Sequence, residues 1–429
     1  MRWTGVAVVK SLEQRLEVLA DAARYDASCA VSVADPRSAR QNEIGIYESV
    51  GPDGRRLALL KILLTNECVF DCSYCIHRRS SDVERARFSP EEVIALTLDY
   101  HRRGLIDGLF LSSGVLDSPD ATMEQLITVA RSLRRNHHYF GYIHLKTIPD
   151  CADELVAEAG RWADRLSVNI EMPRQADLDQ LAPEKSLVQI TRAMNVIRKE
   201  IDEEQRDPLP NARPDHMDQD DGRRFRPQRR FAPAGQTTQM IIGATPATDA
   251  DVLFAAASLY ARQKLRRIYY SAYIPVENGA MADVPPQIAR ERRLYQADWL
   301  IREFGFSAGD LTPPGAENLD LAIDPKLAWA LRNPERFPID VNHAPKDDVL
   351  RVPGLGLRSV EMILTARRRS RITLADLAAM RVPLTRALPF IVAADHIPRE
   401  RGSTVVALSG LRRRWQQLEL FDRTAGQSA

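Results

Sequence analysis

The sequence has few cysteines and no long apolar run. Only five of its 429 residues are cysteine, an odd number that argues against a disulfide framework. No stretch approaches the roughly 20 apolar residues that a membrane-spanning helix needs. The N-terminal residues also lack the apolar run and small-residue cleavage site of a secretory signal. These absences predict a soluble, cytoplasmic protein with no membrane segment.

Positive and negative charges nearly balance over the whole chain, but they are unevenly distributed along the sequence. The formal net charge is +1, which argues against a chain that binds polyanions over its whole surface. From Arg351 to Arg414, however, there are thirteen arginines and only four acidic residues. A phosphate-rich partner is therefore expected at this end of the chain.

Apolar runs alternate with amphipathic segments through the middle of the chain. Segments such as 90–101 and 121–136 carry apolar residues at helical spacing. Six apolar runs are expected to be strands: 57–65, 108–113, 142–148, 166–172, 238–243 and 268–274. Strands that alternate with helices predict an α/β fold, here a partial (β/α)6 barrel. In such barrels the chemistry lies at the C-terminal ends of the strands.

The same patterns divide the chain into five parts. Residues 203–235 are rich in Pro, Asp, Arg and Gln and are expected to be an insertion in the barrel. The predicted parts are an N-terminal helical and loop extension (1–55), the barrel (56–305), a linker with one short helix (306–345), a small all-α domain (346–396) and a basic tail (397–429).

Three of the cysteines lie within eight residues. Cys68, Cys72 and Cys75 have the spacing C-x3-C-x2-C and follow an apolar run directly. Three thiolates on one loop can hold three irons of a cubane cluster, which leaves the fourth iron open to chelation by a small molecule. Tyr74, just before the last cysteine, can offer an aromatic face to a purine.

A structural zinc site is the alternative for these cysteines. Zinc takes four closed ligands, and the nearby candidates for the fourth are His77 and His101. The two remaining cysteines, Cys29 and Cys151, lie far apart and cannot hold a second 4Fe–4S cluster alone. Each is expected to be a small buried hydrophobic residue, with a reactive thiol near the site as the alternative for Cys29.

The cysteine spacing resembles the signature of the radical S-adenosylmethionine (SAM) superfamily, and Asn66 and Tyr74 also fit. The resemblance covers roughly residues 56–305 and implies a partial β/α barrel. It implies that Cys68, Cys72 and Cys75 ligate a 4Fe–4S cluster whose open iron is chelated by SAM. It also implies that one electron, from a donor such as flavodoxin or ferredoxin, splits SAM into methionine and a 5′-deoxyadenosyl radical.

The resemblance extends to the ends of the expected strands. Ser113 and Gly114 resemble the motif that contacts the methionine amino group, although the common form of that motif is Gly-Gly-Glu. Asn169 and Glu171 resemble the Asn-x-Asp/Glu element that holds the ribose, with an ion-pair or helix-cap carboxylate as the alternative for Glu171. Two further segments lie where the superfamily frames the adenine: 239–243 and 273–275.

The segment around residue 354 predicts two helices joined by a tight turn. Gly354 and Gly356 permit the turn and a close backbone approach. The start of the second helix, which includes Arg358, offers backbone N–H groups to a phosphate. The pattern resembles a helix-hairpin-helix motif, which grips the DNA backbone without reading sequence. A helical domain that only packs on the barrel is the alternative.

The order of these features resembles that of bacterial radical SAM proteins classed as DNA modification or repair enzymes. The resemblance includes the opening Tyr25-Asp26-Ala27-Ser28-Cys29, the cysteine segment through Asp82, and the C-terminal hairpin. It implies action on DNA but no particular reaction. The alternatives are an RNA-modifying radical SAM enzyme and a DNA-binding iron–sulfur protein without radical chemistry.

A short motif near the C-terminus suggests a further partner. Gln417, Leu418, Leu420 and Phe421 resemble the peptide with which bacterial replication and repair proteins dock onto the sliding clamp. The apolar side chains would fill a pocket of the clamp, and Gln417 would add an orienting hydrogen bond. An amphipathic helix end that packs on the C-terminal domain is the alternative.

Overall fold

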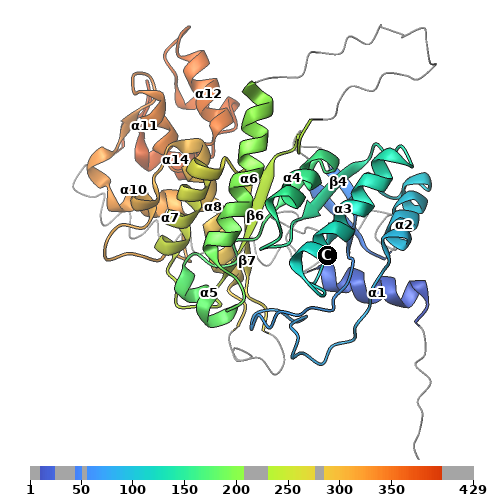
Figure 1. Cartoon of the computed structure of the whole chain (residues 1–429). Helices are drawn as coiled ribbons and strands as arrows, with labels where there is room; N and C mark the ends of the chain where they lie inside the picture. The colour runs from blue at the N-terminus through green and yellow to red at the C-terminus, as the bar shows by residue number, and fades with distance from the viewer. Residues whose placement is uncertain (1–9, 25–43, 51–55, 207–229, 276–284, 399–429) are drawn as a thin grey trace, which may run out of the picture. The chain divides into compact units, whose positions relative to one another are not determined.

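The computed structural model describes residues 10–24, 44–50, 56–206, 230–275 and 285–398 (Figure 1). The chain divides into two compact units. The first unit comprises Met1–Ala247 and Ser258–Pro286, and the second comprises Thr248–Ala257 and Gln287–Ala429. Helix α7 (Asp249–Gln263) begins in the second unit and ends in the first.

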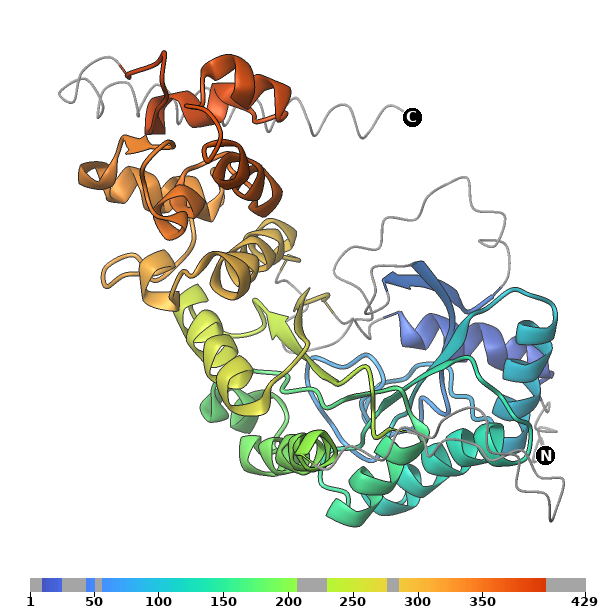
Figure 2. The same ribbon diagram turned by 90° about the horizontal axis from the view of Figure 1, so that it is seen from above.

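A seven-stranded sheet forms the centre of the first unit, with its strands in chain order from β1 to β7. Strand β1 is antiparallel to β2, and every later pairing is parallel. The strands are β1 (Ile46–Val50), β2 (Arg56–Leu63), β3 (Gly108–Ser112), β4 (Tyr142–Lys146), β5 (Arg165–Ser167), β6 (Gln236–Ile242) and β7 (Arg267–Ala272). The sheet curls into a half-barrel with helices along its outer side (Figure 2). The predicted partial barrel is therefore confirmed.

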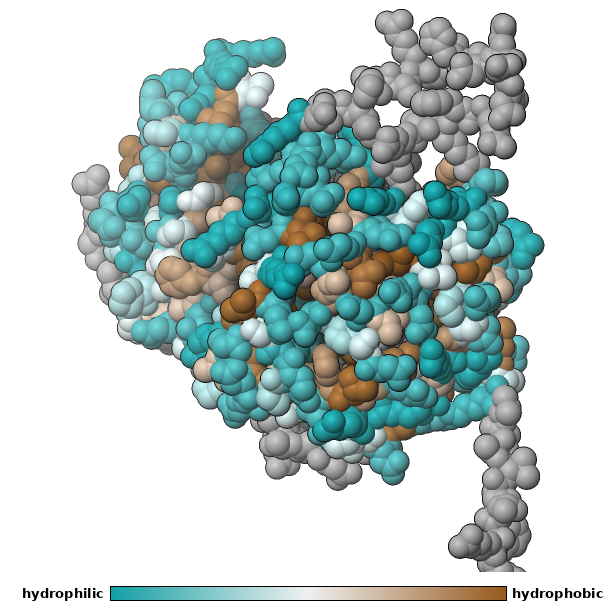
Figure 3. All heavy atoms as spheres, viewed as in Figure 1, coloured by the Kyte–Doolittle hydropathy of each residue, from teal (hydrophilic) through white to brown (hydrophobic). Residues whose placement is uncertain are grey.

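Helices cover the outer side of the sheet. They are α2 (Pro90–Arg102), α3 (Pro119–Arg135), α4 (Asp153–Trp162), α5 (Gln175–Leu181) and α6 (Leu187–Arg206), while α1 (Leu12–Ala23) precedes the sheet in the chain. Helix α2 begins where Ser89 and Glu92 form a capping box. The apolar side of α3 is buried, and its exposed side is mainly hydrophilic (Figure 3).

The first unit differs from the sequence expectation in three places. Strand β1 was not expected, because residues 1–55 were predicted to be helical or loop. Strand β5 ends at Ser167, before the expected end at residue 172, and beyond it Ile170 donates its N–H to the Thr238 hydroxyl. The expected insertion at 203–235 is shorter in the described residues: α6 continues to Arg206, and the Phe231 ring is buried against Gly160.

The second unit is mainly helical and has its own aromatic core. Its elements are α8 (Ile288–Phe304), α9 (Ala308–Leu311), α10 (Pro325–Arg332), η2 (Pro334–Arg336), β8 (Ile339–Asp340), α11 (Lys346–Arg351), α12 (Leu357–Ala366), α13 (Leu374–Ala379), α14 (Leu384–Ala387), η3 (Leu388–Phe390) and β9 (Ile391–Val392). The unit is not all-α as predicted, because strands β8 and β9 pair in parallel. Edge-to-face contacts join Phe306, Trp329, Phe337 and Phe390.

The stretch 306–345 is therefore not the expected linker. It contains α9, α10 and buried side chains such as Leu327 and Trp329. Its high content of Pro and Asn concealed a packed segment, because prolines also begin α10 and η2. In the described part of the chain, no helix is both long and apolar enough to cross a membrane.

Candidate functional site

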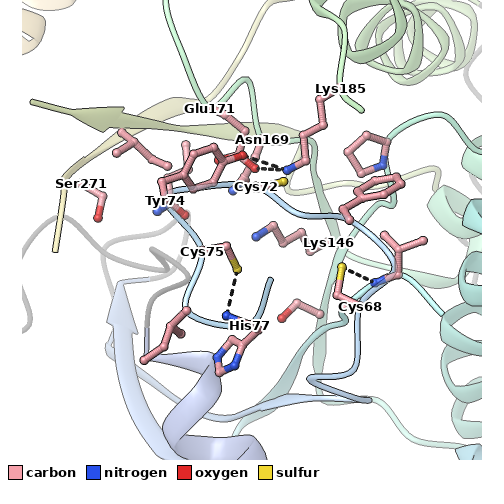
Figure 4. Close-up of a pocket in the computed structure, with 18 of the residues that line it drawn as sticks. Cys68, Cys72, Tyr74, Cys75, His77, Lys146, Asn169, Glu171, Lys185 and Ser271 are labelled. Atoms are coloured by element: carbon pink, nitrogen blue, oxygen red, sulfur yellow. Dashed lines mark hydrogen bonds and ion pairs between the residues drawn. The ribbon is translucent and has the colours of Figure 1, made fainter. Parts of the chain in front are cut away.

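A cavity of about 200 Å³ lies at the C-terminal ends of the strands of the half-barrel (Figure 4). All eight residues that the sequence predicts for the cluster and SAM line it: Cys68, Cys72, Tyr74, Cys75, Ser113, Gly114, Asn169 and Glu171. Residues from the two segments expected near the adenine also line it: Gln239, Ile241, Tyr273, Ile274 and Pro275. The sequence thus predicted residues that the fold gathers from separate strands.

The three cysteines project from the segment that follows β2, called here the cysteine loop (residues 66–77). Cys68 Sγ accepts a hydrogen bond from the Val115 N–H and Cys75 Sγ accepts one from the His77 N–H, both at 3.4 Å. Burial raises the pKa of the Cys72 thiol and raises that of Cys75 to about 12. Iron that binds these thiols must therefore displace their protons.

Gly114 allows the cysteine loop to lie against the end of β3. A Cβ at this position would overlap the Glu67 carbonyl oxygen. The Gly114 N–H also donates to the Thr65 carbonyl at 2.7 Å. Gly114 therefore has a packing role beside its place in the cavity wall, since any side chain would push the cysteine loop away.

Glu171 forms an ion pair inside the cavity. The Lys185 ammonium lies 2.8 Å from its Oε1 and donates to the Tyr74 hydroxyl at 3.1 Å (Figure 4). Glu171 has a backbone φ of 63°, a left-handed conformation that is uncommon for a residue with a side chain. The ion-pair alternative for Glu171 is thus present, and the same carboxylate also faces the cavity.

Burial and the neighbouring charges shift the pKa values of these groups. Burial, followed by the Glu171 charge, raises the pKa of Tyr74 well above its usual value. Burial alone would lower the pKa of Lys185, but the Glu171 carboxylate outweighs it and the pKa rises well above 10.5. The cavity wall therefore holds a charged lysine and a neutral phenol beside the cysteines.

Sequence reasoning missed several residues of the cavity wall, above all Lys146 and Lys185. Lys185 belongs to a segment that packs on the cysteine loop: the Ser73 N–H donates to the Leu181 carbonyl, and the Asp71 N–H donates to Glu184. These partners are more than 100 residues apart, so no local pattern could reveal them. Lys146 was easier to predict, because it lies near the end of an expected strand, 142–148, and is the last residue of β4.

The donor set of the cavity fits an iron–sulfur cluster. Three thiols approach one cavity from a single loop, and two of their sulfurs accept backbone N–H hydrogen bonds. Such hydrogen bonds stabilise and tune cluster thiolates. In the part of the chain that the structure describes, no three His, Cys, Asp or Glu side chains are grouped closely enough to hold a single metal ion.

Two predictions about other residues have different outcomes. Cys151 is buried just before α4, and burial raises its pKa to about 12, so it is the small hydrophobic residue that was expected. Cys29 and the motif at 417–421 lie outside the described residues.

The predicted pair of helices around Gly354 is present in the second unit as α11 and α12, joined by residues 352–356, called here the hairpin turn. Gly354 has a φ of 85°, and a Cβ there would lie 2.9 Å from the Arg386 Cβ. Gly356 precedes α12, has ordinary φ, and has open space where a Cβ would stand. Arg358 is exposed in the first turn of α12.

The sequence and the fold were compared with known proteins. Residues 62–203 match the Radical SAM superfamily, and no curated protein matches the chain. Similar solved structures include the FeFe-hydrogenase maturase HydG from Carboxydothermus hydrogenoformans (14% identity, 56% of this chain and 50% of that chain, TM-score 0.40). Methylornithine synthase PylB is also similar (12% identity, 68% of this chain and 67% of that chain, TM-score 0.40). So is the radical SAM methyltransferase TsrM from Kitasatospora setae (11% identity, 54% of this chain and 38% of that chain, TM-score 0.35).

The aligned part of this chain spans about half the length of the HydG structures. The superfamily match includes the cysteine loop and every strand and helix from β3 to α5, and it ends inside α6 at residue 203. The chain therefore contains a radical SAM superfamily domain over residues 62–203, and enzymes of that superfamily use a 4Fe–4S cluster and SAM.

Proposed function

We propose that this chain is a radical SAM enzyme that abstracts a hydrogen atom from DNA, and that its second unit binds the DNA backbone. The observation that carries the DNA assignment is the set of exposed arginines around α12 and α13. These are Arg358, Arg368, Arg369, Arg371 and Arg381. Exposed arginines are the expected contacts for a phosphate backbone.

Two other arginines of this segment have structural roles. Arg351 packs over the rings of Phe306 and Trp329 at 4.5 and 4.8 Å. Arg367 donates to two backbone carbonyls, those of Val341 and Ala344. Because these two side chains serve the core of the second unit, the exposed arginines are the ones that remain for a partner.

Within the cavity, Cys68, Cys72 and Cys75 would hold the cluster and leave one iron without a protein ligand. When bound, the cluster supplies the electron that splits SAM into methionine and a 5′-deoxyadenosyl radical. Asn169 and Glu171 are proposed to accept hydrogen bonds from the ribose hydroxyls, and Ser113 is proposed to contact the methionine amino group. Apolar side chains such as Leu63, Val115 and Ile241 line the cavity and would keep water from the reacting atoms.

Isotope transfer tests the substrate. The reconstituted protein would be supplied with SAM, a reductant and duplex DNA made from perdeuterated deoxynucleotides, and the 5′-deoxyadenosine would be analysed by mass spectrometry. Hydrogen abstraction from DNA places deuterium in the 5′-deoxyadenosine, whereas perdeuterated RNA leaves it unlabelled. Label from RNA alone would assign the activity to RNA instead. DNA binding without any 5′-deoxyadenosine would favour an iron–sulfur protein without radical chemistry.

Two partners belong to the same proposal. A flavodoxin or ferredoxin would supply the electron, and the bacterial sliding clamp would bind the motif that includes Leu420 and Phe421. A calorimetric titration of a peptide spanning 412–426 against the clamp tests the second partner. Binding that disappears when both residues are changed to Ala supports it, and the absence of binding by the unchanged peptide refutes it.

A further inference from the structure

Arg85 joins the two ends of the cysteine loop. Its Nη1 donates to the carbonyl oxygens of Asn66 at 2.5 Å and His77 at 3.0 Å. Its Nη2 donates to the carbonyls of Arg78 at 2.7 Å and Ser81 at 2.9 Å. Asn66 stands two residues before Cys68, and His77 stands two residues after Cys75. One guanidinium therefore spans the segment that carries all three thiols.

We propose that Arg85 is a positioning residue that holds the cysteine loop in its ligating conformation before the cluster is assembled. A guanidinium presents its N–H donors in a rigid planar fork, so it can serve four carbonyls at once. A lysine concentrates its three donors on one nitrogen and cannot span the same acceptors. The number and placement of the acceptors thus explain why an arginine stands here.

The backbone that carries Arg85 is itself fixed. The Asn66 side chain donates to the Glu84 carbonyl at 2.7 Å and accepts from the Ala86 N–H at 2.8 Å. The Lys10 ammonium donates to the Arg85 carbonyl at 2.7 Å. Since the backbone on both sides of Arg85 is held, its contacts are a built part of the structure rather than a chance placement of a surface side chain.

The hydrogen bonds of Arg85 reach the cysteines through His77. The same residue whose carbonyl accepts from Arg85 donates its N–H to Cys75 Sγ at 3.4 Å. Holding the His77 backbone therefore keeps this hydrogen bond in place. A cysteine loop that is ordered in advance loses less conformational entropy when iron binds, so the cluster should be retained more firmly.

The test uses the full chain and two arginine variants. Arg85→Met removes all four hydrogen bonds, while Arg79→Met is the matched control, because exposed Arg79 donates from its side chain to one carbonyl, that of Val69, at 3.4 Å. Hydrogen exchange of residues 66–81 would be measured in the apo protein, and the rate of iron loss to a ferrous chelator would be measured after reconstitution. The inference rests on the cluster cofactor and not on the choice of DNA as substrate.

We expect Arg85→Met to speed exchange in residues 66–81 and iron loss by roughly tenfold each, with helix α3 unchanged and Arg79→Met like the wild type. Arg85→Lys should retain little of the protection, because it cannot span the four acceptors. Equal rates in Arg85→Met and wild type would overturn the inference. If Arg85→Met or the milder Arg85→Lys speeds hydrogen exchange equally across the whole barrel, Arg85 stabilises the fold in general, and this would also overturn the inference. If the wild type binds no iron but still exchanges more slowly than Arg85→Met in residues 66–81, the cluster assignment is wrong and the role of Arg85 in ordering the cysteine loop stands.

Discussion

Each unit contains a lysine with a shifted pKa, and these two lysines meet opposite surroundings. In the first unit Lys185 pairs with Glu171 at 2.8 Å, and its pKa is raised despite burial. In the second unit Lys326 donates to the Leu355 carbonyl at 2.6 Å, and burial lowers its pKa to about 7 although Asp324 partly opposes the shift. The cavity therefore fixes a charge, whereas the hairpin turn is held by an amine that can lose its charge near neutral pH.

The largest expected effect comes from breaking the ion pair in the cavity. Glu171→Gln leaves the Lys185 ammonium buried without its carboxylate, and it should destabilise the first unit by about 3–5 kcal/mol. Changing Lys185 to Met in the same chain should recover part of this loss. Urea unfolding of the apo protein, monitored by hydrogen exchange in α3, measures both changes in stability. The exposed pair Lys199–Glu203 supplies the control, and Glu203→Gln should cost less than about 0.5 kcal/mol. If Glu171→Gln is as stable as Glu203→Gln, the ion pair in the cavity does not stabilise the first unit more than an exposed pair does.

The next effect is a pH dependence confined to the second unit. Between pH 7 and 10 the unfolded chain binds a proton at Lys326 that the folded chain does not, since the folded pKa is about 7. Stability of the second unit should therefore rise with pH across this window, by at most about 1.4 kcal/mol per pH unit. Lys326→Met should remove this contribution, whereas Lys346→Met, at an exposed lysine, should leave it. The measurement is urea unfolding at several pH values, monitored by hydrogen exchange in α12. If the stability of wild type and of Lys326→Met depends on pH with the same slope, the assignment to Lys326 is wrong.

Two glycines of the hairpin turn give a smaller and more selective effect. Gly354→Ala meets both a left-handed backbone and the Arg386 Cβ, and should destabilise the second unit by roughly 1–3 kcal/mol. Gly356→Ala meets open space, and should change stability by less than about 1 kcal/mol. If DNA approaches the hairpin turn, Gly356→Ala should nevertheless weaken binding to duplex DNA. Unchanged affinity in an electrophoretic mobility assay would argue against that approach.

The smallest expected effect concerns the exposed arginines. Changing Arg368 and Arg369 to Gln should leave stability unchanged and weaken binding to every duplex sequence alike. The slope of log affinity against log salt should become shallower by about 0.9 for each phosphate that the variant no longer neutralises. Arg135→Gln, at an exposed arginine of α3, is the control in the first unit. An unchanged salt slope in the double variant would remove the main support for DNA binding by the second unit.

Local patterns predicted the parts of the site that local sequence can encode. The cysteine spacing, Tyr74 and the ends of β3 and β5 were found because each lies in or beside a recognisable strand. Lys185 was not found, because its partners Glu171 and Tyr74 come together only when the chain after α5 folds back onto the cysteine loop. Arg85 was missed for a related reason. Its four partners are backbone carbonyls, and since every residue has one, the sequence does not show which carbonyls an arginine will contact.

The same limit explains the errors in the fold. Segment 306–345 has the composition of a linker, but its aromatic residues pack with Phe390, which lies far along the chain. Strand β1 is five residues long and is specified by its pairing with β2 rather than by a clear apolar alternation. Six parallel strands were predictable because their apolar runs are buried on both sides and alternate regularly with helices.

The central claim is that Cys68, Cys72 and Cys75 hold the cluster at which SAM is cleaved. The most direct measurement is the yield of 5′-deoxyadenosine from the anaerobically reconstituted and reduced protein, together with its iron content. We expect one 4Fe–4S cluster and 5′-deoxyadenosine formation in the wild type, and loss of both when any of the three cysteines is changed to Ala. A triple variant that still cleaves SAM, or a wild type that holds full zinc and no iron, would contradict it.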